Sequence, residues 1–166
     1  MKRNEVFTPP TKWDNGDYTI NGVVPLNLFL GGSIDNGEAL DWQKALIGEL
    51  NSEDTIKPIM IYNPRRDNWD KDVDKKELEL QIKWELYHLE RADLVVMNIL
   101  GGSKSPISLL ELGLFARTNK LLVFCSPSFY RFDNVKVTCE QYSVPLFETN
   151  DILVIKNEVL KHANIR

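Results

Sequence analysis

The chain has 166 residues, a length typical of one domain, since domains usually hold about 100–200 residues. It carries 20 Lys and Arg against 24 Asp and Glu, for a net charge of −4, and its basic residues occur in short pairs with acids nearby. This pattern excludes the basic run that tracks a nucleic-acid polymer or an anionic membrane. Hydrophobic residues make up 43% of the chain, which is enough for a folded core.

Membrane and metal signals are also missing from the sequence. The longest apolar runs, such as 121–125, are far shorter than the ~20 residues of a membrane span. The basic N-terminus is not followed by the apolar region of a signal peptide. Cys125 and Cys139 have no metal or redox spacing, and neither His88 nor His162 has a second soft ligand nearby. We therefore expect a cytoplasmic protein with no membrane partner, no metal and no cofactor.

Residues 1–25 are predicted to form an N-terminal arm, because paired turn residues separate its single apolar residues. Residues 26–166 are predicted to form a single domain. Its predicted strands cover 26–30, 58–62, 94–97, 121–124 and 145–147. Its predicted helices cover 38–50, 75–91, 106–118, 134–142 and 151–162.

Short apolar strands that alternate with longer helices are typical of βαβ units around a buried parallel sheet. The fold class predicted is therefore α/β, a three-layer sandwich with a five-stranded parallel sheet. Ligands bind such sheets beyond the carboxyl ends of the strands, where the strand order reverses. The segments predicted to wall a pocket are those that follow four of the strands: 31–33, 63–69, 98–106 and 126–134.

The segment 105–113 is the most informative in the chain. Ser105 suits a helix N-cap and Pro106 suits the first helical position, so a helix should begin at the carboxyl edge of the sheet. Its free amides would suit a phosphate or another anion. Glu111 lies in this helix among leucines. Either the helix turns Glu111 toward solvent, or a carboxylate lies among apolar groups at the pocket.

A second acid has a similar setting. Glu85 falls on the apolar stripe of the helix predicted at 75–91, one turn after Gln81. A surface salt bridge from Glu85 to Lys83 or Arg91 is the alternative. Two carboxylates among apolar groups, near the ends of adjacent strands, are what acid/base or nucleophilic chemistry at a sugar carbon needs.

Other candidates follow the first two strands. Gly31, Gly32 and Ser33 would allow a ligand close to the backbone. In the loop after the second strand, Arg65 and Arg66 suit an anion and Trp69 suits stacking on a base; the alternative is a charged surface loop with Trp69 packed on the domain. Away from these loops, we expect helix packing or a surface position for His88, and a core position for Cys125.

Five segments with their spacing resemble the nucleoside 2-deoxyribosyltransferase-like family, which includes a branch that hydrolyses deoxynucleoside 5′-monophosphates. These segments are 29–34, 63–69, 81–85, 92–93 and 105–113. The resemblance extends over about residues 24–160. It implies a flavodoxin-like sheet of five parallel strands and a homodimer or higher homo-oligomer, in which a neighbouring subunit completes the site.

The resemblance also implies roles for the two acids. Glu111 takes the place of the family's nucleophile, which attacks the anomeric carbon of a (deoxy)nucleoside, expels the base and forms a glycosyl ester. Another base or water then resolves that ester. Glu85 takes the place of the family acid that contacts or protonates the departing base. The expected enzyme is thus a deoxyribosyltransferase or an N-glycosidase of nucleotide metabolism or salvage.

Two departures from the family pattern bear on substrate. Ser105 stands where the transferases carry an Asp, six residues before the nucleophile, whereas the monophosphate hydrolases carry Ser there. Residues 31–33 hold no aromatic, so Trp69 or Phe129 is expected to supply the stacking. Among Tyr130, Asp133 and Asn134, our choice for the polar residue that enters a neighbour's site is Asn134.

The predicted ligand is a small nucleoside or nucleotide, and a non-catalytic module that binds such a ligand in the same pocket is the alternative function. Glu111 and Glu85 are the predicted catalytic residues. The predicted substrate-binding residues are Gly31, Gly32, Ser33, Asn63, Arg65, Arg66, Trp69, Gln81, Asn98, Ser105, Ser108 and Asn134.

Overall fold

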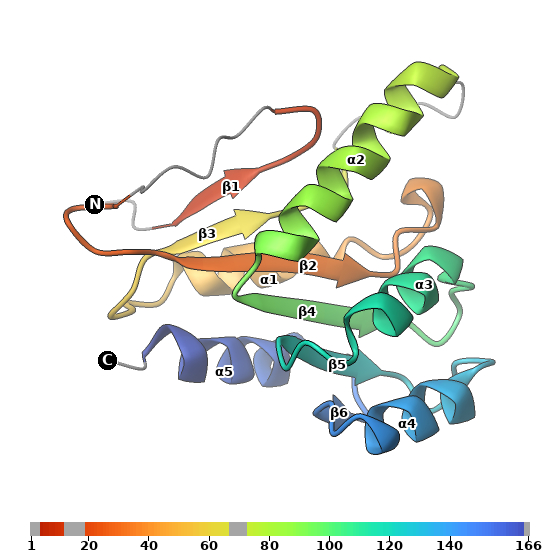
Figure 1. Cartoon of the computed structure of the whole chain (residues 1–166). Helices are drawn as coiled ribbons and strands as arrows, with labels where there is room; N and C mark the ends of the chain where they lie inside the picture. The colour runs from red at the N-terminus through yellow and green to blue at the C-terminus, as the bar shows by residue number, and fades with distance from the viewer. Residues whose placement is uncertain (1–3, 12–18, 67–72, 165–166) are drawn as a thin grey trace.

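The computed structural model describes residues 4–11, 19–66 and 73–164 (Figure 1). Its strands are β1 (Glu5–Phe7), β2 (Leu26–Gly32), β3 (Ile59–Tyr62), β4 (Leu94–Ile99), β5 (Leu121–Cys125) and β6 (Leu146–Phe147). Its α-helices are α1 (Trp42–Asn51), α2 (Lys75–Arg91), α3 (Pro106–Phe115), α4 (Phe132–Gln141) and α5 (Ile152–Ala163). A short 3-10 turn, Asp35–Gly37, lies between β2 and α1.

The strands form one sheet in the order β1-β3-β2-β4-β5-β6, and every pair is parallel. The chain passes from β2 to β3 on one side and then returns across β2 to β4 on the other. The strand order therefore reverses between β2 and β4, which is where sheets of this kind bind ligands. The predicted α/β, flavodoxin-like class is confirmed.

The sheet has six strands among the described residues, not the five predicted. The additional strand, β1, belongs to the predicted arm and pairs with β3 at the edge of the sheet. Val6 is exposed there, while Phe7 stacks on Tyr62 with 5.7 Å between ring centroids. Three residues with this little burial leave no clear alternation in the sequence, which explains why the strand was missed.

Helices cover both faces of the sheet, as Figure 1 shows. On one face, α2, α3 and α4 pack on side chains such as Val95, Met97 and Cys125. On the other, α1 and α5 pack on alternate residues such as Val96 and Phe124. Cys125 is fully buried, as predicted for the core. Within the described part of the chain, no helix has the length and apolar character needed to cross a membrane.

Helix α2 has the predicted bounds, with Asp74 accepting hydrogen bonds from the first helical amides, but two strands run further than predicted. Gly31 and Gly32 lie within β2, and Asn98 lies within β4. Gly32 has φ +120°, and a Cβ there would be 2.2 Å from the Asn98 carbonyl oxygen. Strands β2 and β4 approach so closely at Gly32 that only glycine fits there. This requirement comes from the backbone of β4 and not from the sequence around Gly32.

Candidate active site

A cavity of about 560 Å³ opens at the carboxyl ends of β2 and β4, between α2 and α3. Its volume is in the range typical of small-molecule sites. The lining residues that the sequence predicted are Gly31, Gly32, Gln81, Glu85, Ser105, Ser108 and Glu111. The predicted wall segments also supply Pro64, Gly102, Lys104 and Pro106, whereas the sequence missed Ile34, Asp35, Asn36, Glu38 and Ile107. Asp35 and Asn36 belong to the turn signal Asp35-Asn36-Gly37, which begins three residues after Gly32.

Glu111 lies in the second turn of α3 and is 7% exposed. Its carboxylate lies over β2, because a Cβ built on Gly31 would be 3.6 Å from Glu111 Oε2. The alternative of a solvent-facing Glu111 is thus wrong. The helix turns two of its leucines outward instead: Leu110 is 59% and Leu114 is 55% exposed.

Glu85 enters the same cavity from α2. The side-chain amide of Gln81, one turn earlier, donates to Glu85 Oε1 at 2.9 Å. The predicted alternative, a salt bridge to Lys83 or Arg91, is absent from the described contacts of Glu85. Lys83 pairs with Glu79, and the Arg91 guanidinium lies 3.7 Å from the centre of the Tyr87 ring.

Burial shifts the titration of both carboxyls. Burial, and in second place the charge of Glu85, raises the pKa of Glu111 to about 8. Burial also raises the pKa of Glu85, while the Gln81 hydrogen bond and the charge of Arg66 oppose that rise. Near neutral pH the pair therefore holds a proton, the condition in which one carboxyl acts as an acid beside a second that acts as a base or nucleophile.

Ser105 is the N-cap residue of α3, as predicted, but its side chain caps no helical amide. Its hydroxyl lies 2.7 Å from that of Ser33 and 2.5 Å from that of Ser103. Ser33 is fully buried and accepts a hydrogen bond from the amide of Leu100 at 2.9 Å. Ser33 thus supports Ser105 from behind and does not line the cavity.

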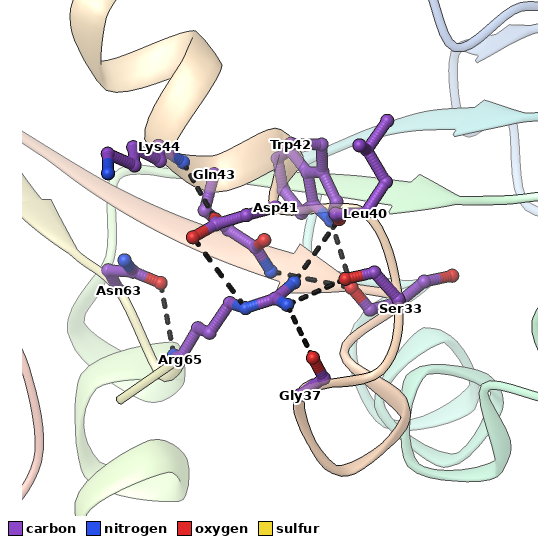
Figure 2. Close-up of polar contacts among 10 residues, drawn as sticks. Ser33, Gly37, Leu40, Asp41, Trp42, Gln43, Lys44, Asn63 and Arg65 are labelled. Carbon is purple, nitrogen blue, oxygen red and sulfur yellow. Dashed lines mark hydrogen bonds and ion pairs between the residues drawn. The ribbon is translucent and has the colours of Figure 1, made fainter. Parts of the chain in front are cut away.

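Arg65 holds a loop and does not line the cavity (Figure 2). Its guanidinium donates to the carbonyl oxygens of Gly37, Ala39 and Leu40 at 2.9, 2.6 and 3.2 Å, and its Nε lies 3.8 Å from Asp41 Oδ2. These bonds fix the segment that carries Asp35, Asn36 and Glu38 to the cavity wall. The predicted Asn63 acts in the same assembly, since its Oδ1 accepts the amide of Arg65 at 3.0 Å.

Four further predicted residues lie away from the cavity lining. Asn98 is buried on the α1 and α5 side of β4, where it accepts a 2.6 Å hydrogen bond from Asn150 Nδ2. Arg66 is half-buried and acts on Glu85 through its charge. Phe129 is buried in the core, and Asn134 is exposed on α4.

Trp69, the other predicted stacking residue, lies outside the described residues. Of the two positions expected for His88, helix packing and the surface, the structure shows packing. Its ring centroid lies 4.2 Å from that of Tyr62 and 4.5 Å from that of Trp84. In the described ranges, no group of three or more His, Cys, Asp or Glu side chains is placed to hold a metal ion.

The parallel sheet, its point of strand reversal and the paired buried carboxyls define a flavodoxin-like α/β protein with a candidate active site. The family described as nucleoside 2-deoxyribosyltransferase like matches residues 25–129, more than half of the chain, and the protein belongs to this family. The matched range contains every residue that lines the cavity, whereas Asn134 lies beyond it. A search of curated proteins finds no match.

Proposed function

We propose that this protein cleaves the N-glycosidic bond of a nucleoside or nucleotide and passes the sugar to another base or to water. The observation that carries the proposal is the pair Glu111 and Glu85, which line one cavity of the size a nucleoside needs, in a member of the nucleoside deoxyribosyltransferase-like family. Glu111 is buried against β2, which suits a nucleophile, and Gln81 orients Glu85.

The reaction has two displacements. A Glu111 carboxylate oxygen bonds to the anomeric carbon while the carbon–nitrogen bond breaks, and its electron pair stays with the base. Glu85 donates the proton that the departing base takes up. In the second step, an acceptor base or a water molecule gives its proton to the Glu85 carboxylate and attacks the same carbon, the ester bond breaks and Glu111 leaves as a carboxylate.

Helix α3 sets the direction of the sugar in the cavity. Ser105 lies six residues before Glu111, which is about 9 Å along the helix axis at 1.5 Å per residue. A pentose with its anomeric carbon at Glu111 therefore extends toward Ser105, while its base lies on the side of Gln81 and Glu85.

We also propose a homodimer that covers the mouth of this cavity. On α2, Leu78, Ile82 and Leu86 form an exposed stripe with spacings of four residues. On α3, Ile107, Leu110 and Leu114 form a second stripe. By helical geometry each stripe borders the acid of its helix, and Ile107 also lines the cavity. Exposed apolar surface beside a ligand site is typical of an interaction surface.

A cytoplasmic setting stays a prediction. Cys125 and Cys139 are both free thiols and both buried, which suits a reducing compartment. Fractionation of the native host cells with an antibody to the chain is the direct measurement. Recovery in the soluble cytoplasmic fraction supports this setting, and recovery in a secreted fraction contradicts it.

The alternative, a module that binds without turnover, uses the same cavity and differs in outcome. Purified protein is incubated with a panel of nucleosides and 5′-monophosphates, with and without a second free base, and base release or exchange is followed by chromatography. We expect release by the wild type and its loss in Glu111→Gln. Tight binding with no base released by the wild type supports the alternative and contradicts the proposal.

A further inference from the structure

The N-terminal arm contacts helix α2 beside the candidate acid. The indole Nε1 of Trp84 donates to the main-chain oxygen of Thr11 at 3.0 Å. Trp84 is 8% exposed and directly precedes Glu85 in α2. Figure 1 shows the loop after β1 lying beside the middle of this helix. The family match begins at residue 25, so it assigns no role to the arm.

The arm is itself fixed to the sheet. Strand β1 pairs with β3, and the carbonyl of Phe7 accepts the amide of Asn63 at 2.9 Å. Beyond the strand, the amide of Thr11 donates to the carbonyl of Thr8 at 3.0 Å, which closes a turn. The position of the oxygen that accepts from Trp84 is thus set by the sheet and this turn, and not by α2.

Helix α2 has few contacts that would fix its rotation about its own axis. Its first six residues, 75–80, are exposed, and its buried residues are Gln81, Trp84, His88 and Leu89. Apolar contacts have no direction, so this narrow stripe holds the helix to the sheet without setting its rotation. The hydrogen bond from Gln81 to Glu85 lies within the helix and turns with it. The bond from Trp84 is directional and reaches another element, so it opposes rotation.

A small rotation of α2 would move Glu85 by a distance that matters for chemistry. Side chains reach about 5–6 Å from a helix axis, so a rotation of about 10° displaces a carboxyl by roughly 1 Å. A misplacement of about 1 Å can lower a rate by up to ~100-fold. Lys120 holds the last turn of the helix, where it donates to the carbonyls of Leu89 and Glu90. The bond of Trp84 acts one residue from Glu85 itself.

We infer that Trp84 is a positioning residue: bound to the carbonyl of Thr11, it holds α2 in the rotation that keeps Glu85 in the cavity. The arm thus supports the candidate active site and is more than an edge strand. Trp84 acts through Glu85, because it packs on Tyr62 and is not one of the residues that line the cavity. The role of Glu85 as the acid rests on the proposed function, whereas the contact between the arm and α2 does not.

A double-mutant cycle tests this positioning role. Trp84→Phe keeps an aromatic ring in the core and removes the indole N–H. We expect kcat/KM for base release to fall about tenfold, with KM changed less than about twofold. In the Glu85→Gln background the same substitution should change kcat/KM less than about twofold, because no acid is left to misplace. Equal losses in the two backgrounds would show a general loss of packing and overturn the inference.

A second substrate gives the comparison without the Glu85→Gln background. A purine nucleoside methylated at N7 carries a positive charge on its base, which departs without taking up a proton. Trp84→Phe should release this base within about twofold of the wild-type rate, while it loses about tenfold on the unmethylated nucleoside. A loss of the same size on both substrates contradicts the inference.

Two further variants act on the arm and on the aromatic cluster around Trp84. Phe7→Ala removes the ring that stacks on Tyr62 and so weakens the docking of the arm. It should lower kcat/KM about threefold in the wild type and not in Glu85→Gln, and it decides the question if Trp84→Phe does not fold.

Tyr62→Phe is the matched control. It removes the 3.1 Å hydrogen bond from the Tyr62 hydroxyl to Asn27, keeps the ring that packs on Trp84, and leaves the bond to Thr11 in place. It should keep kcat/KM within about twofold of the wild type. A loss in Tyr62→Phe as large as that in Trp84→Phe overturns the inference.

Hydrogen exchange separates this inference from the proposed function, because it needs no substrate. Mass spectrometry of the α2 peptide over residues 75–86 should show exchange about threefold or more faster in Trp84→Phe than in Tyr62→Phe. If this difference is found but the wild type releases no base, the proposed function fails and the placement of α2 by the arm stands. If base is released and the cycle gives equal losses, only the inference fails. If neither base release nor the exchange difference is found, both fail. Circular dichroism and thermal melts establish that each variant is folded.

Discussion

The carboxylate of Glu111 lies directly over Gly31, so that a methyl group on Gly31 would be 3.6 Å from Glu111 Oε2. The contact distance is ordinary, and the backbone needs no left-handed conformation there. Gly31→Ala should therefore leave the free energy of unfolding within about 1 kcal/mol of the wild type. The methyl group fills the floor of the cavity at the reacting carboxylate, so kcat/KM should fall about tenfold or more.

Gly32→Ala is the matched control. Its Cβ would lie 2.2 Å from the Asn98 carbonyl oxygen in a backbone of φ +120°, so the variant should lose roughly 3 kcal/mol or more of stability. Urea unfolding of the two variants, with kinetics on Gly31→Ala, checks both statements. Equal stability losses at the two positions would show that the geometry of the β2 end is wrong.

Titration of Glu111 predicts the pH dependence of activity. The pKa of Glu111 is about 8 because of burial and the charge of Glu85, and only its carboxylate form attacks the anomeric carbon, so kcat/KM should rise as the pH rises through this value. Glu85→Gln removes the neighbouring charge, so its lower activity should rise at a lower pH. A wild-type profile that is flat through pH 8 contradicts the role of Glu111.

The same shift predicts a cost in stability. Glu111 binds its proton in the folded state up to about pH 8 but in the unfolded state only to about pH 4.5. The folded state thus holds more protons between these values, and the free energy of unfolding falls as the pH rises through them. Glu111→Gln should be more stable than the wild type at pH 8, by roughly 2–4 kcal/mol. Urea titrations at pH 5 and pH 8 measure the difference, and equal stabilities at pH 8 would contradict the burial of a charge.

His88 predicts acid sensitivity of the fold. Burial, with a smaller contribution from Arg91, lowers the pKa of His88 to about 4, and its Nδ1 is buried with no hydrogen-bond partner among the described residues. The unfolded state takes up a proton below about pH 6.5 and the folded state does not, so stability falls as the pH drops from 6.5 toward 4. His88→Phe, which keeps the stack on Tyr62, should reduce this acid loss, and His162→Gln should not. An unchanged acid midpoint in His88→Phe would contradict the prediction.

The proposed dimer depends on exposed leucines of α3. Leu110→Glu combined with Leu114→Glu should give a monomer, because charges in an apolar interface are costly. Light scattering after gel filtration reads the mass. Leu153→Glu, at an exposed position of α5 on the other face of the sheet, is the control that should keep the dimer. A monomeric wild type contradicts the proposal.

The sequence predicted much of the fold and part of the site. The alternation of apolar runs and helices predicted five of the six strands, because buried parallel strands leave continuous apolar runs. Glu111 and Glu85 could be found because each interrupts an apolar stripe. The edge strand β1 could not be found, since three half-exposed residues produce no such pattern.

Other parts of the site depend on contacts between distant segments. Arg65 was predicted to bind an anion, but its guanidinium meets carbonyls of residues 37–40, a partner that appears only when β2 and β3 are neighbours. The bond between Asp35 and Ser103 joins residues 68 positions apart. In the sequence, the run Asp35-Asn36-Gly37 indicates only a turn.

The central claim is that Glu111 carries the sugar as an ester. The direct measurement is intact-protein mass spectrometry of the wild type and Glu111→Gln after acid quench during turnover of the best nucleoside, followed by peptide mapping. We predict an added mass of one sugar residue in the wild type, located on the peptide that contains Glu111, and none in Glu111→Gln. An adduct at another residue, or base release by Glu111→Gln at the wild-type rate, would contradict the account.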